Sequence, residues 1–485
     1  MASATAKLNG SYYTPSIVAR TLIRWVVRKR TDRLLDPACG DGEFLALHSN
    51  SVGVEFNQSA AIAASRRTPG SVVHVEDFFV YANRTKERFD CAAGNPPFIR
   101  YQSFAGDVRR RALDYCNCHG ARFSELSSSW APFLVAAASL LKRGGRMAFV
   151  VPAEIGHARY AAPLISFLMR SFKIVHLVAI RQTVFTDLSQ DVWLLYADGY
   201  GENTDHIALS VWDQFKSVLR RPNTFQRVSS KQWESWGCRL RPFLVTNGVR
   251  QLYERLRESS QTQQLGDAAR VGIGYVSGAN DFFHLRPSAA KSVRIPDDFL
   301  LPTVRNGRVL PTQSVNRATL ARWIEQDEAC LLLRLQANTI LPQSVLNYLG
   351  SAEGRLAQRS YKCSHRKPWY VVPDVLIPDG FLSYMSGDGP SLVSNSAGCS
   401  CTNSVHAVRM KDGYKFSQLQ AAWGHPLTRL STELEGHPLG GGMLKLEPRE
   451  ASRVLLPNPS LTLSAHDLQQ LREGREVLRK WRHYA

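Results

Sequence analysis

The stretch Arg33-Leu34-Leu35-Asp36-Pro37-Ala38-Cys39-Gly40-Asp41-Gly42 decides the fold of the first part of the chain. A short apolar run ends in an aspartate, and a turn with two glycines follows it. Glycine lets a backbone turn tightly and approach a ligand closely. The stretch therefore predicts a buried strand that leads into a ligand-binding loop.

Similar apolar runs recur on either side of helical patterns through the first 200 residues. The runs lie at 33–38, 51–56, 72–77, 90–95, 146–151, 175–180 and 192–197, and the helical patterns at 15–28, 58–66, 130–142 and 160–171. The runs are continuously apolar, which indicates burial on both faces, as a parallel sheet requires. The alternation predicts an α/β domain with a doubly wound, mostly parallel, seven-stranded sheet. Ligands of such sheets bind beyond the carboxyl ends of the strands.

The rhythm changes after about residue 200, where segments become irregular and Pro and Gly are frequent. We expect a catalytic domain in 1–200, a connection in 201–240 and a second, α+β domain in 241–485, which ends in a helix over 464–481. No internal repeat or low-complexity segment is present.

The composition indicates which class of molecule the protein binds. The 485 residues include 60 Lys and Arg against 41 Asp and Glu, a net charge of +19, and both halves are basic. A folded basic chain suggests a polyanion, nucleic acid before membrane, although a soluble protein that is merely basic is the alternative. The longest apolar run, 130–141, is too short to cross a bilayer. Nine cysteines do not make a disulfide scaffold in a chain of this length, so a reducing cytoplasm is expected.

Three acidic residues follow successive predicted strands: Asp36, Glu55 and Asp77. A carboxylate at Glu55 can accept both hydrogen bonds from a ribose diol, and one at Asp77 can accept a bond from an adenine amine. Each acid alone has an alternative role at a strand end or as a helix N-cap. Together they predict a pocket for an adenosine-containing cofactor.

The fourth strand ends in Asn95-Pro96-Pro97-Phe98. Two prolines restrict the backbone, so the Asn95 amide oxygen and the Pro96 carbonyl form a rigid pair of acceptors suited to a planar NH2 group. Phe98 supplies an aromatic face. The alternative is a Pro-rich turn closed by a core Phe, but the position on a cofactor-binding sheet favours a catalytic role.

These motifs, in this order, resemble the S-adenosylmethionine-dependent adenine-N6 DNA methyltransferases of the gamma, TaqI-like type found in restriction-modification systems. The resemblance covers residues 1–200, and fewer motifs match in the second domain. It implies a Rossmann-like class I methyltransferase fold, S-adenosyl-L-methionine as cofactor, and a target-recognition domain over 241–485. The cofactor-binding residues it implies are Tyr13, Thr14, Pro15, Asp36, Pro37, Ala38, Cys39, Gly40, Gly42, Glu55, Asp77, Phe78 and Asn95.

The resemblance also implies the reaction, a methyl transfer to the N6 amine of an adenine flipped out of a specific duplex DNA sequence. Phe98 stands where the family more often has Tyr, and stacking needs only the ring. The catalytic residues are Asn95, Pro96, Pro97, Phe98 and, from a later motif in which an aromatic residue stacks on the base, Phe185. For Phe185 an apolar residue before a strand is the alternative.

Double-stranded DNA is the expected partner, with a separate restriction endonuclease as a second one. The candidate DNA contacts are Arg100, Arg109, Arg110, Arg111, Asn280, Arg366 and Lys367. For the three consecutive arginines a solvated helix face is the alternative. We expect a monomer in catalysis, no membrane contact and a cytoplasmic location.

No metal site is expected. Zinc knuckles have a C-x2-C spacing, which Cys116-x-Cys118, Cys363-x-His365 and Cys399-x-Cys401 lack. Buried or free thiols are the preferred interpretation over a zinc site that joins the last two pairs.

Other functions stay open at this stage. The motif NPP(Y/F) also serves methyltransferases that act on RNA or on a protein glutamine amide. A DNA-binding relative without catalysis is a further alternative, against which the intact Asn95, Asp36, Glu55 and Asp77 argue. A fused nuclease is not expected, because the first motif begins at residue 12.

Overall fold

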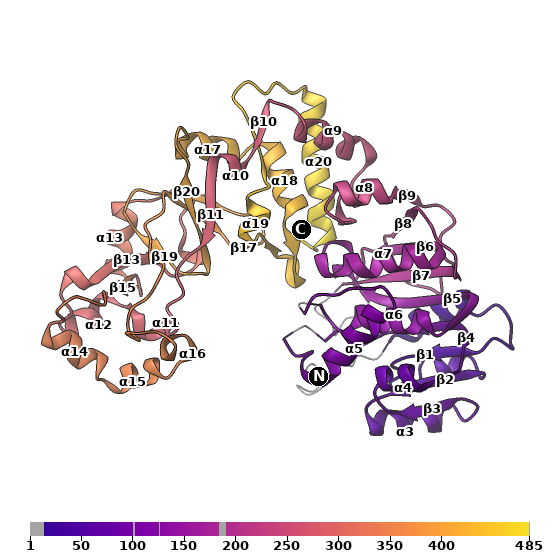
Figure 1. Ribbon diagram of the computed structural model, residues 1–485. Coiled ribbons are helices and arrows are strands. Elements are labelled where there is room, and N and C mark those ends of the chain that lie inside the picture. Colours follow the sequence, from indigo (N-terminus) through magenta and orange to yellow (C-terminus); the bar gives the residue numbers. More distant parts are fainter. Residues whose placement is uncertain (1–13, 100–101, 126, 184–190, 485) are drawn as a thin grey trace. The chain divides into compact units, whose positions relative to one another are not determined.

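The computed structural model describes residues 14–99, 102–125, 127–183 and 191–484 (Figure 1). The chain divides into two compact units, 1–244 and 245–485. Across the described ranges, no helix combines the length and the apolar character needed to span a bilayer.

A large mixed sheet forms the centre of the first unit. Among the described residues it has nine strands, in the order β3-β2-β1-β4-β5-β7-β6-β8-β9. Strands β1 to β5 pair in parallel, and β7 runs antiparallel between β5 and β6. In chain order the strands are β1 (Leu34–Asp36), β2 (Ser51–Glu55), β3 (Val72–Val75), β4 (Phe89–Gly94), β5 (Leu141–Pro152), β6 (Phe172–Ile180), β7 (Val192–Tyr200), β8 (His206–Trp212) and β9 (Gln226–Ser229).

Each of the seven predicted runs overlaps one of the strands β1 to β7, and two further strands extend the sheet. The segment 201–240, predicted as a connection, instead contributes β8, parallel to β6, and β9, antiparallel to β8. This segment is therefore part of the first unit. The prediction failed because the apolar run His206–Trp212 is followed by a polar, Pro-containing stretch that resembles a linker.

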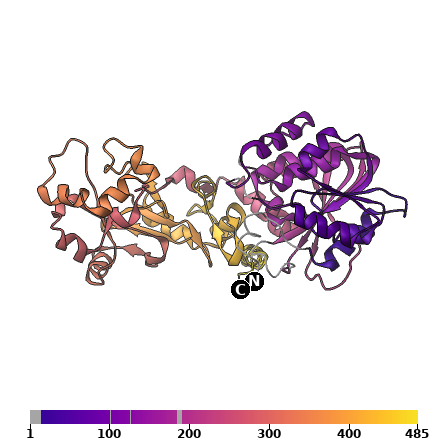
Figure 2. The same ribbon diagram turned by 90° about the horizontal axis from the view of Figure 1, so that it is seen from below.

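Helices cover the faces of this sheet (Figures 1 and 2). One core cluster joins Val18, Leu22 and Val26 of the first helix to Ala148 and Val150 of β5. Alternate residues of the second half of β5 thus face this helix, and residues 147–151 are all apolar and buried. The helices are α2 (Ser16–Val26), α3 (Gln58–Arg67), α4 (Phe78–Arg84), α5 (Gly106–Cys118), α6 (Trp130–Ser139), α7 (Ala162–Ser171) and α8 (Ser230–Ser235).

The strand order reverses between β1 and β4, which are parallel neighbours. Connections leave these two strands in opposite directions, and this opens a crevice at their carboxyl ends. The crevice is the place where a ligand binds in folds of this type. Asp36 ends β1, and Asn95 follows β4 directly.

Short strands and helices make up the second unit, as the predicted α+β class requires. Its sheets, within the described residues, have the orders β10-β23, β11-β20-β16-β18-β14, β12-β15-β13-β19 and β17-β22-β21. The strands are β10 (Thr262–Gln264), β11 (Ala269–Ile273), β12 (His284–Leu285), β13 (Leu300–Val304), β14 (Ser314–Val315), β15 (Leu331–Leu333), β16 (Gly380–Ser383), β17 (Met385–Ser386), β18 (Leu392–Asn395), β19 (Ser400–Cys401), β20 (Val405–Met410), β21 (His437–Pro438), β22 (Leu444–Lys445) and β23 (Leu455–Pro457).

The helices of the second unit gather at two ends of it (Figure 1). At one end α9 and α18 pack on the long helix α20, whose N-cap Ser464 forms a capping box with Asp467. The predicted helix over 464–481 is thereby confirmed. The helices are α9 (Asn247–Arg257), α10 (Leu265–Ala268), α11 (Asn280–Phe283), α12 (Pro287–Ser292), α13 (Arg317–Glu325), α14 (Gln343–Leu349), α15 (Ala352–Gln358), α16 (Tyr361–Ser364), α17 (Phe416–Trp423), α18 (Pro426–Glu435), α19 (Pro448–Ala451) and α20 (Ala465–Trp481).

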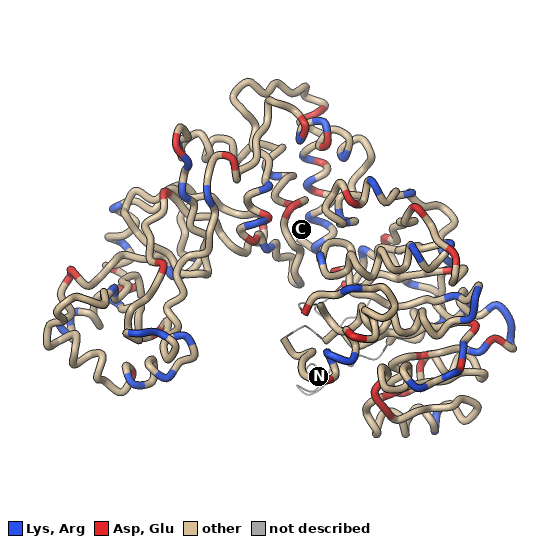
Figure 3. Tube along the Cα trace, viewed as in Figure 1, with Lys and Arg blue, Asp and Glu red and all other residues tan. Residues whose placement is uncertain are grey.

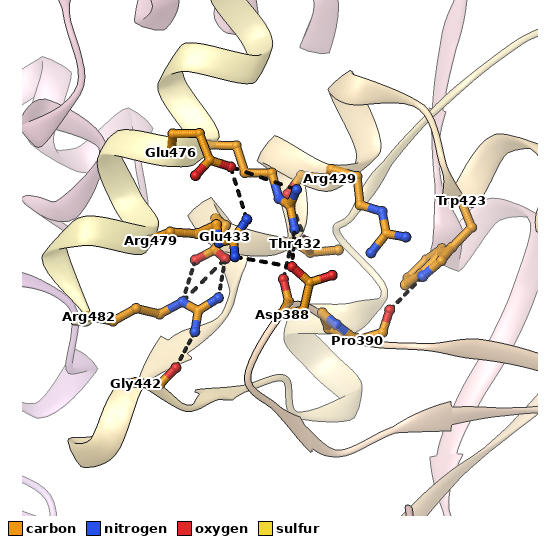
Figure 4. Close-up of polar contacts among 11 residues, drawn as sticks. Asp388, Pro390, Trp423, Arg429, Thr432, Glu433, Gly442, Glu476, Arg479 and Arg482 are labelled. Atoms are coloured by element: carbon orange, nitrogen blue, oxygen red, sulfur yellow. Dashed lines mark hydrogen bonds and ion pairs between the residues drawn. The ribbon is translucent and has the colours of Figure 1, made fainter. Parts of the chain in front are cut away.

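A buried ion pair joins the end of α20 to α18 (Figure 4). Arg482 Nη2 lies 2.7 Å from Glu433 Oε1, and neither side chain is more than 1% exposed. Arg482 Nη1 also donates to the carbonyl oxygen of Gly442. Charges removed from water in this way require partners, so the pair fixes the end of the helix in place.

Candidate active site

The loop after β1 is built around a buried carboxylate. Asp36 is 1% exposed, and its Oδ1 accepts a bond of 3.2 Å from the backbone N–H of Ala38. Its Oδ2 is buried without a hydrogen-bond partner among the described residues. An orphaned buried acceptor of this kind is costly unless a ligand supplies a donor.

Burial raises the pKa of Asp36 from 3.8 to about 8. The bond from the Ala38 N–H lowers this pKa in part, and the charge of Glu55 raises it. Without a ligand the carboxyl therefore holds a proton near neutral pH. A cationic ligand beside Asp36 would favour the ionised form.

The glycines of this loop have left-handed backbones, with φ of +54° at Gly40 and +87° at Gly42. At Gly42 a Cβ would also lie 3.2 Å from the Cα of Ala64 in α3. The neighbouring Cys39 is buried, and this burial raises the pKa of its thiol well above the usual range. Cys39 is thus a packed side chain rather than a nucleophile.

Glu55, at the end of β2, holds this loop from the side. Its Oε2 accepts from the backbone N–H of Gly40 at 3.0 Å, and its Oε1 from that of Asn57 at 2.8 Å. The side chain is half-buried, and each oxygen has a further lone pair. The carboxylate is therefore fixed in direction and still able to accept from a ligand.

Asp77 is the N-cap of α4. Its Oδ1 accepts from the backbone N–H groups of Phe79 at 2.9 Å and Val80 at 3.1 Å. Its Oδ2 lies 3.7 Å from Nη2 of Arg111 on α5. Capping, the alternative weighed from sequence, thus occupies one oxygen of Asp77. The next residue, Phe78, is buried and stacks on Phe133, with ring centroids 5.4 Å apart.

Asn95 lies on the crevice side of β4 and contacts the N-terminal motif. Its Nδ2 donates to Oγ1 of Thr14 at 3.2 Å, and its Oδ1 is buried without a partner among the described residues. Thr14 precedes Pro15, the N-cap of α2. The structure therefore joins two of the predicted motifs through one amide.

The Pro-Pro turn after Asn95 is clamped by Ser129, the N-cap residue of α6. Ser129 Oγ donates to the Pro97 carbonyl and accepts from the N–H of Ile99 at 3.0 Å. The N–H of Ser129 donates to the Ile99 carbonyl, also at 3.0 Å. Sequence reasoning missed this residue, although a serine just before an apolar helix is a known N-terminal signal. Phe98 is half-buried and packs on the core cluster beneath α2.

Asp36 and the NPPF segment lie close together because Gly94 has no side chain. A Cβ at Gly94 would lie 2.6 Å from Oδ1 of Asp36. The crevice thus brings two partnerless acceptors, Asp36 Oδ2 and Asn95 Oδ1, to the ends of neighbouring strands. A site with these groups suits a ligand that carries hydrogen-bond donors or positive charge.

The other predicted residues are placed as follows. Tyr13, Phe185 and Arg100 lie outside the described residues. On α5, Arg109 donates to the Glu125 carbonyl, Arg110 pairs with Asp107 at 2.9 Å, and Arg111 is the neighbour of Asp77 described above. In the second unit Asn280 and Lys367 are exposed, whereas Arg366 donates to two backbone carbonyls.

The cysteines do not assemble a site. Cys363 belongs to one core cluster, and Cys399 and Cys401 belong to another. Over the ranges the structure describes, no three His, Cys, Asp or Glu side chains converge as a metal site would need.

Family profiles match along most of the chain. The profile of the Type II methyltransferase M.Eco57I, C-terminal domain, matches residues 239–483, just over half of the sequence. The chain belongs to this family of Type II methyltransferases. Profiles of the Eco57I restriction-modification methylase and of the N-6 DNA methylase match residues 54–185 and 1–65 of the methyltransferase.

Individual proteins agree with this assignment. The methyltransferase is 20% identical over 465 residues to the Type II methyltransferase M.AccI of Acinetobacter calcoaceticus, which covers 92% of this chain and 84% of that one. It is 22% identical over 478 residues to M.XamI of Xanthomonas campestris pv. amaranthicola, with coverages of 93% and 85%. The Type IIL restriction-modification enzyme MmeI, solved in complex with DNA, has a similar fold, with a TM-score of 0.55 at 12% identity over 96% of this chain and 71% of that one.

The predicted family and the predicted Rossmann-like class I methyltransferase fold are thus confirmed. The motifs of the first 200 residues were sufficient to predict both the family and the fold. The methyltransferase is of the restriction-modification type, whose chemistry is DNA methylation.

Proposed function

We propose that this methyltransferase uses S-adenosyl-L-methionine to methylate the exocyclic N6 amine of an adenine that has been rotated out of a specific duplex DNA sequence. The observation that carries the proposal is the buried, partnerless Oδ1 of Asn95 in the NPPF turn. A fixed acceptor at this place is what a planar amine requires, and the N-6 DNA methylase profile supports the choice of atom.

The residues of the crevice fit the cofactor. Gly40 and Gly42 keep the loop free of side chains, Asp36 Oδ2 awaits a donor or cation, and the Glu55 carboxylate is fixed at the end of β2. We assign Glu55 to the ribose, and Asp77 to the adenine amine through its second oxygen. When bound, S-adenosylmethionine supplies an electrophilic methyl group.

Asn95 and Pro96 act on the target amine. The lone pair of an aromatic amine is delocalised into the ring, which makes the nitrogen a poor nucleophile. When Asn95 Oδ1 and the Pro96 carbonyl accept its two hydrogens, the nitrogen can become pyramidal and direct its lone pair away from the ring. The new N–C bond would replace the bond between the methyl carbon and the cofactor's sulfur, which would become a neutral thioether, and the methylated nitrogen would then release one proton to solvent. Positioning within the crevice is the main source of rate acceleration in this scheme.

The target base must leave the helix, because a paired base cannot reach a crevice of this kind. Phe98 beside Asn95 supplies one aromatic face for the extruded base, and we assign the opposite face to Phe185. Unstacking a base costs a few kcal/mol, which stacking on aromatic side chains and contacts to phosphates offset.

An RNA or a protein glutamine amide remains the competing substrate, since either carries an amine that an NPPF turn could hold. The second unit favours DNA, because the family that matches it is that of Type II methyltransferases.

Methyl transfer from labelled cofactor tests the proposal. Duplex DNA, RNA and total protein are offered separately, and the DNA is then digested and its nucleosides separated. We expect label in duplex DNA as N6-methyldeoxyadenosine, and loss of at least three orders of magnitude of kcat in Asn95→Ala with unchanged cofactor affinity. Label on cytosine, RNA or protein would refute the substrate, and an active Asn95→Ala would refute the mechanism.

A further inference from the structure

The second unit contains an open hollow beside α15 and α16. It has a volume of about 820 Å³, and its lining residues are Gln358, Arg359, Ser364, Arg366, Lys367, Pro368 and Trp369. We call it the basic hollow. It lies at the end of the second unit opposite to α9 and α20 (Figure 1).

Lys and Arg residues are frequent along the chain of α15 and α16, beside the basic hollow (Figure 3). Segment 353–367 carries five Lys and Arg residues, namely Arg355, Arg359, Lys362, Arg366 and Lys367, against the one acid Glu353. Arg359, Lys362 and Lys367 are exposed, and none of the carboxylates described forms an ion pair with them. On other helices, arginines have carboxylate partners, as Arg110 on α5 and Arg479 on α20 do. The surplus of positive charge here is therefore local.

Exposed non-polar surface accompanies the charge. Tyr361 is 74% exposed and Leu356 is 73% exposed, on either side of Arg359 in the sequence. Single aromatic and aliphatic side chains among unpaired cations are typical of surfaces that bind nucleic acid, where rings and stems pack on sugars while cations contact phosphates.

The basic hollow has a rigid floor. Arg366 donates from Nη1 to the Ser277 carbonyl and from Nη2 to the Val276 carbonyl, each at 2.6 Å. Gly278, with φ of +87°, lies so close to α16 that a Cβ there would be 2.8 Å from the Cβ of Lys362. Trp369 packs on Phe282 of α11, with centroids 5.7 Å apart. These contacts hold the backbone that carries the exposed cations in place before binding, which lowers the entropic cost of ordering that backbone.

Arg366 consequently differs from its neighbours in function. Two of its five N–H donors are committed to the backbone of 276–277, the segment that leads into the exposed Asn280. Arg366 is a positioning residue for the floor of the basic hollow. Arg359 and Lys367 have no carboxylate partner among the described residues, and Nζ of Lys362 lies 5.9 Å from the ring centroid of Tyr361.

We propose that the basic hollow is where the second unit holds the phosphodiester backbone of duplex DNA, through Arg359 and Lys367 of its lining. The inference rests on the proposed function, because it takes DNA as the substrate. It adds the surface that holds DNA and separates the cations that contact phosphate from the one that supports them.

Salt-dependent binding of a fluorescent duplex to the full chain tests this. Each cation removed from a phosphate contact lowers the slope of log K against log salt by about 1. The double variant Arg359→Gln/Lys367→Gln should lose about two units of slope, with a raised KM for DNA and an unchanged kcat. The matched control Arg255→Gln/Lys480→Gln, on α9 and α20, removes the same charges and should keep the slope.

Arg366→Ala separates support from contact. We expect a lowered melting temperature for it, and unchanged melting for the double Gln variant. If the double variant keeps the salt slope of the wild type, the inference is overturned, and an acidic protein surface becomes the expected ligand of the basic hollow. The inference is also overturned if the control variant loses as much slope as the double variant. If the wild type labels only RNA or protein, the proposed function itself fails and the inference with it. If the wild type labels DNA, the proposed function holds, and the binding data then test the basic hollow alone.

Discussion

The side-chain nitrogen of Asn95 donates a hydrogen bond of 3.2 Å to the hydroxyl oxygen of Thr14, 81 residues earlier in the chain. A carboxamide is planar, so fixing its nitrogen also fixes the direction of its oxygen. Thr14 thereby orients Oδ1 of Asn95, the acceptor left without a partner. Thr14 is a positioning residue for the amide.

Replacement of Thr14 tests this relationship. Thr14→Val keeps the shape of the side chain and removes the acceptor, so we expect kcat to fall by about 5- to 10-fold, the equivalent of one hydrogen bond. Thr14→Ser keeps the acceptor and should restore most of the activity. Single-turnover kinetics at saturating cofactor measure both. Equal losses in the two variants would show that Thr14 contributes only packing.

Asp36 makes stability depend on pH. Its pKa is about 8 in the folded chain, where burial favours the neutral acid, and 3.8 for the ordinary group. Its contribution to stability is therefore fully present below pH 3.8 and is lost as the pH rises to about 8, by roughly 1.4 kcal/mol per pH unit. Asp36→Asn cannot ionise and escapes this loss.

We accordingly expect Asp36→Asn to gain thermal stability over the wild type as the pH rises from 5 to 8, while it binds the cofactor more weakly. Thermal unfolding at several pH values without cofactor measures the difference. A difference in melting temperature that is constant with pH would mean that Asp36 is already ionised in the folded chain.

Gly94 tests the close approach of β4 to the cofactor loop. Gly94→Ala puts a Cβ 2.6 Å from Oδ1 of Asp36, so the carboxylate must move. We expect cofactor affinity to fall by at least 10-fold and stability by about 1–3 kcal/mol. Gly272→Ala in β11 is the control, because a Cβ there meets nothing within 4 Å. Calorimetric titration with cofactor would reveal normal binding in Gly94→Ala if the loop can yield.

The buried pair of Arg482 and Glu433 should be worth far more than its neighbours (Figure 4). Arg482→Met removes the guanidinium group that pairs with the buried Glu433 carboxylate, which costs about 3–5 kcal/mol. Arg479→Met removes an arginine that pairs with Asp388 and Glu476, both at least half exposed, and should cost at most about 1 kcal/mol. Urea unfolding compares the two variants, and similar midpoints would argue against a structural role for the buried pair.

Much of the first unit follows from pattern alone. Runs such as 51–56 and 146–151 are mostly apolar because helices cover both faces of the strands that contain them, and their charged positions, Glu55 and Arg146, are only half-buried. Strands β8 and β9 were not predicted because they follow the last apolar run that stands out in the sequence. Strand β9 is also a short edge strand. Edge strands need less apolar sequence, so they leave a weaker signal.

The site was predictable in its chemistry and not in its contacts. Asp36, Glu55 and Asn95 stand out because they follow strands whose ends must meet. The clamp of Ser129 on the Pro97 turn and the bond between Thr14 and Asn95 join residues far apart in the chain. Local sequence does not encode which distant hydroxyl will meet which amide, so only the folded chain reveals these pairs.

Strands β11 and β20 pair antiparallel from Ala269 with Met410 to Ile273 with His406. The chain therefore leaves this strand pair after residue 273 and returns to it at neighbouring positions before residue 406. The segment between, which includes the basic hollow, thus has adjacent ends, and its strands β16 and β17 pair with β20 and β22 outside it. Insertions with adjacent ends are well tolerated by the fold that receives them. Any exchange of this segment at its two adjacent ends would therefore have to preserve the pairings of β16 with β20 and of β17 with β22.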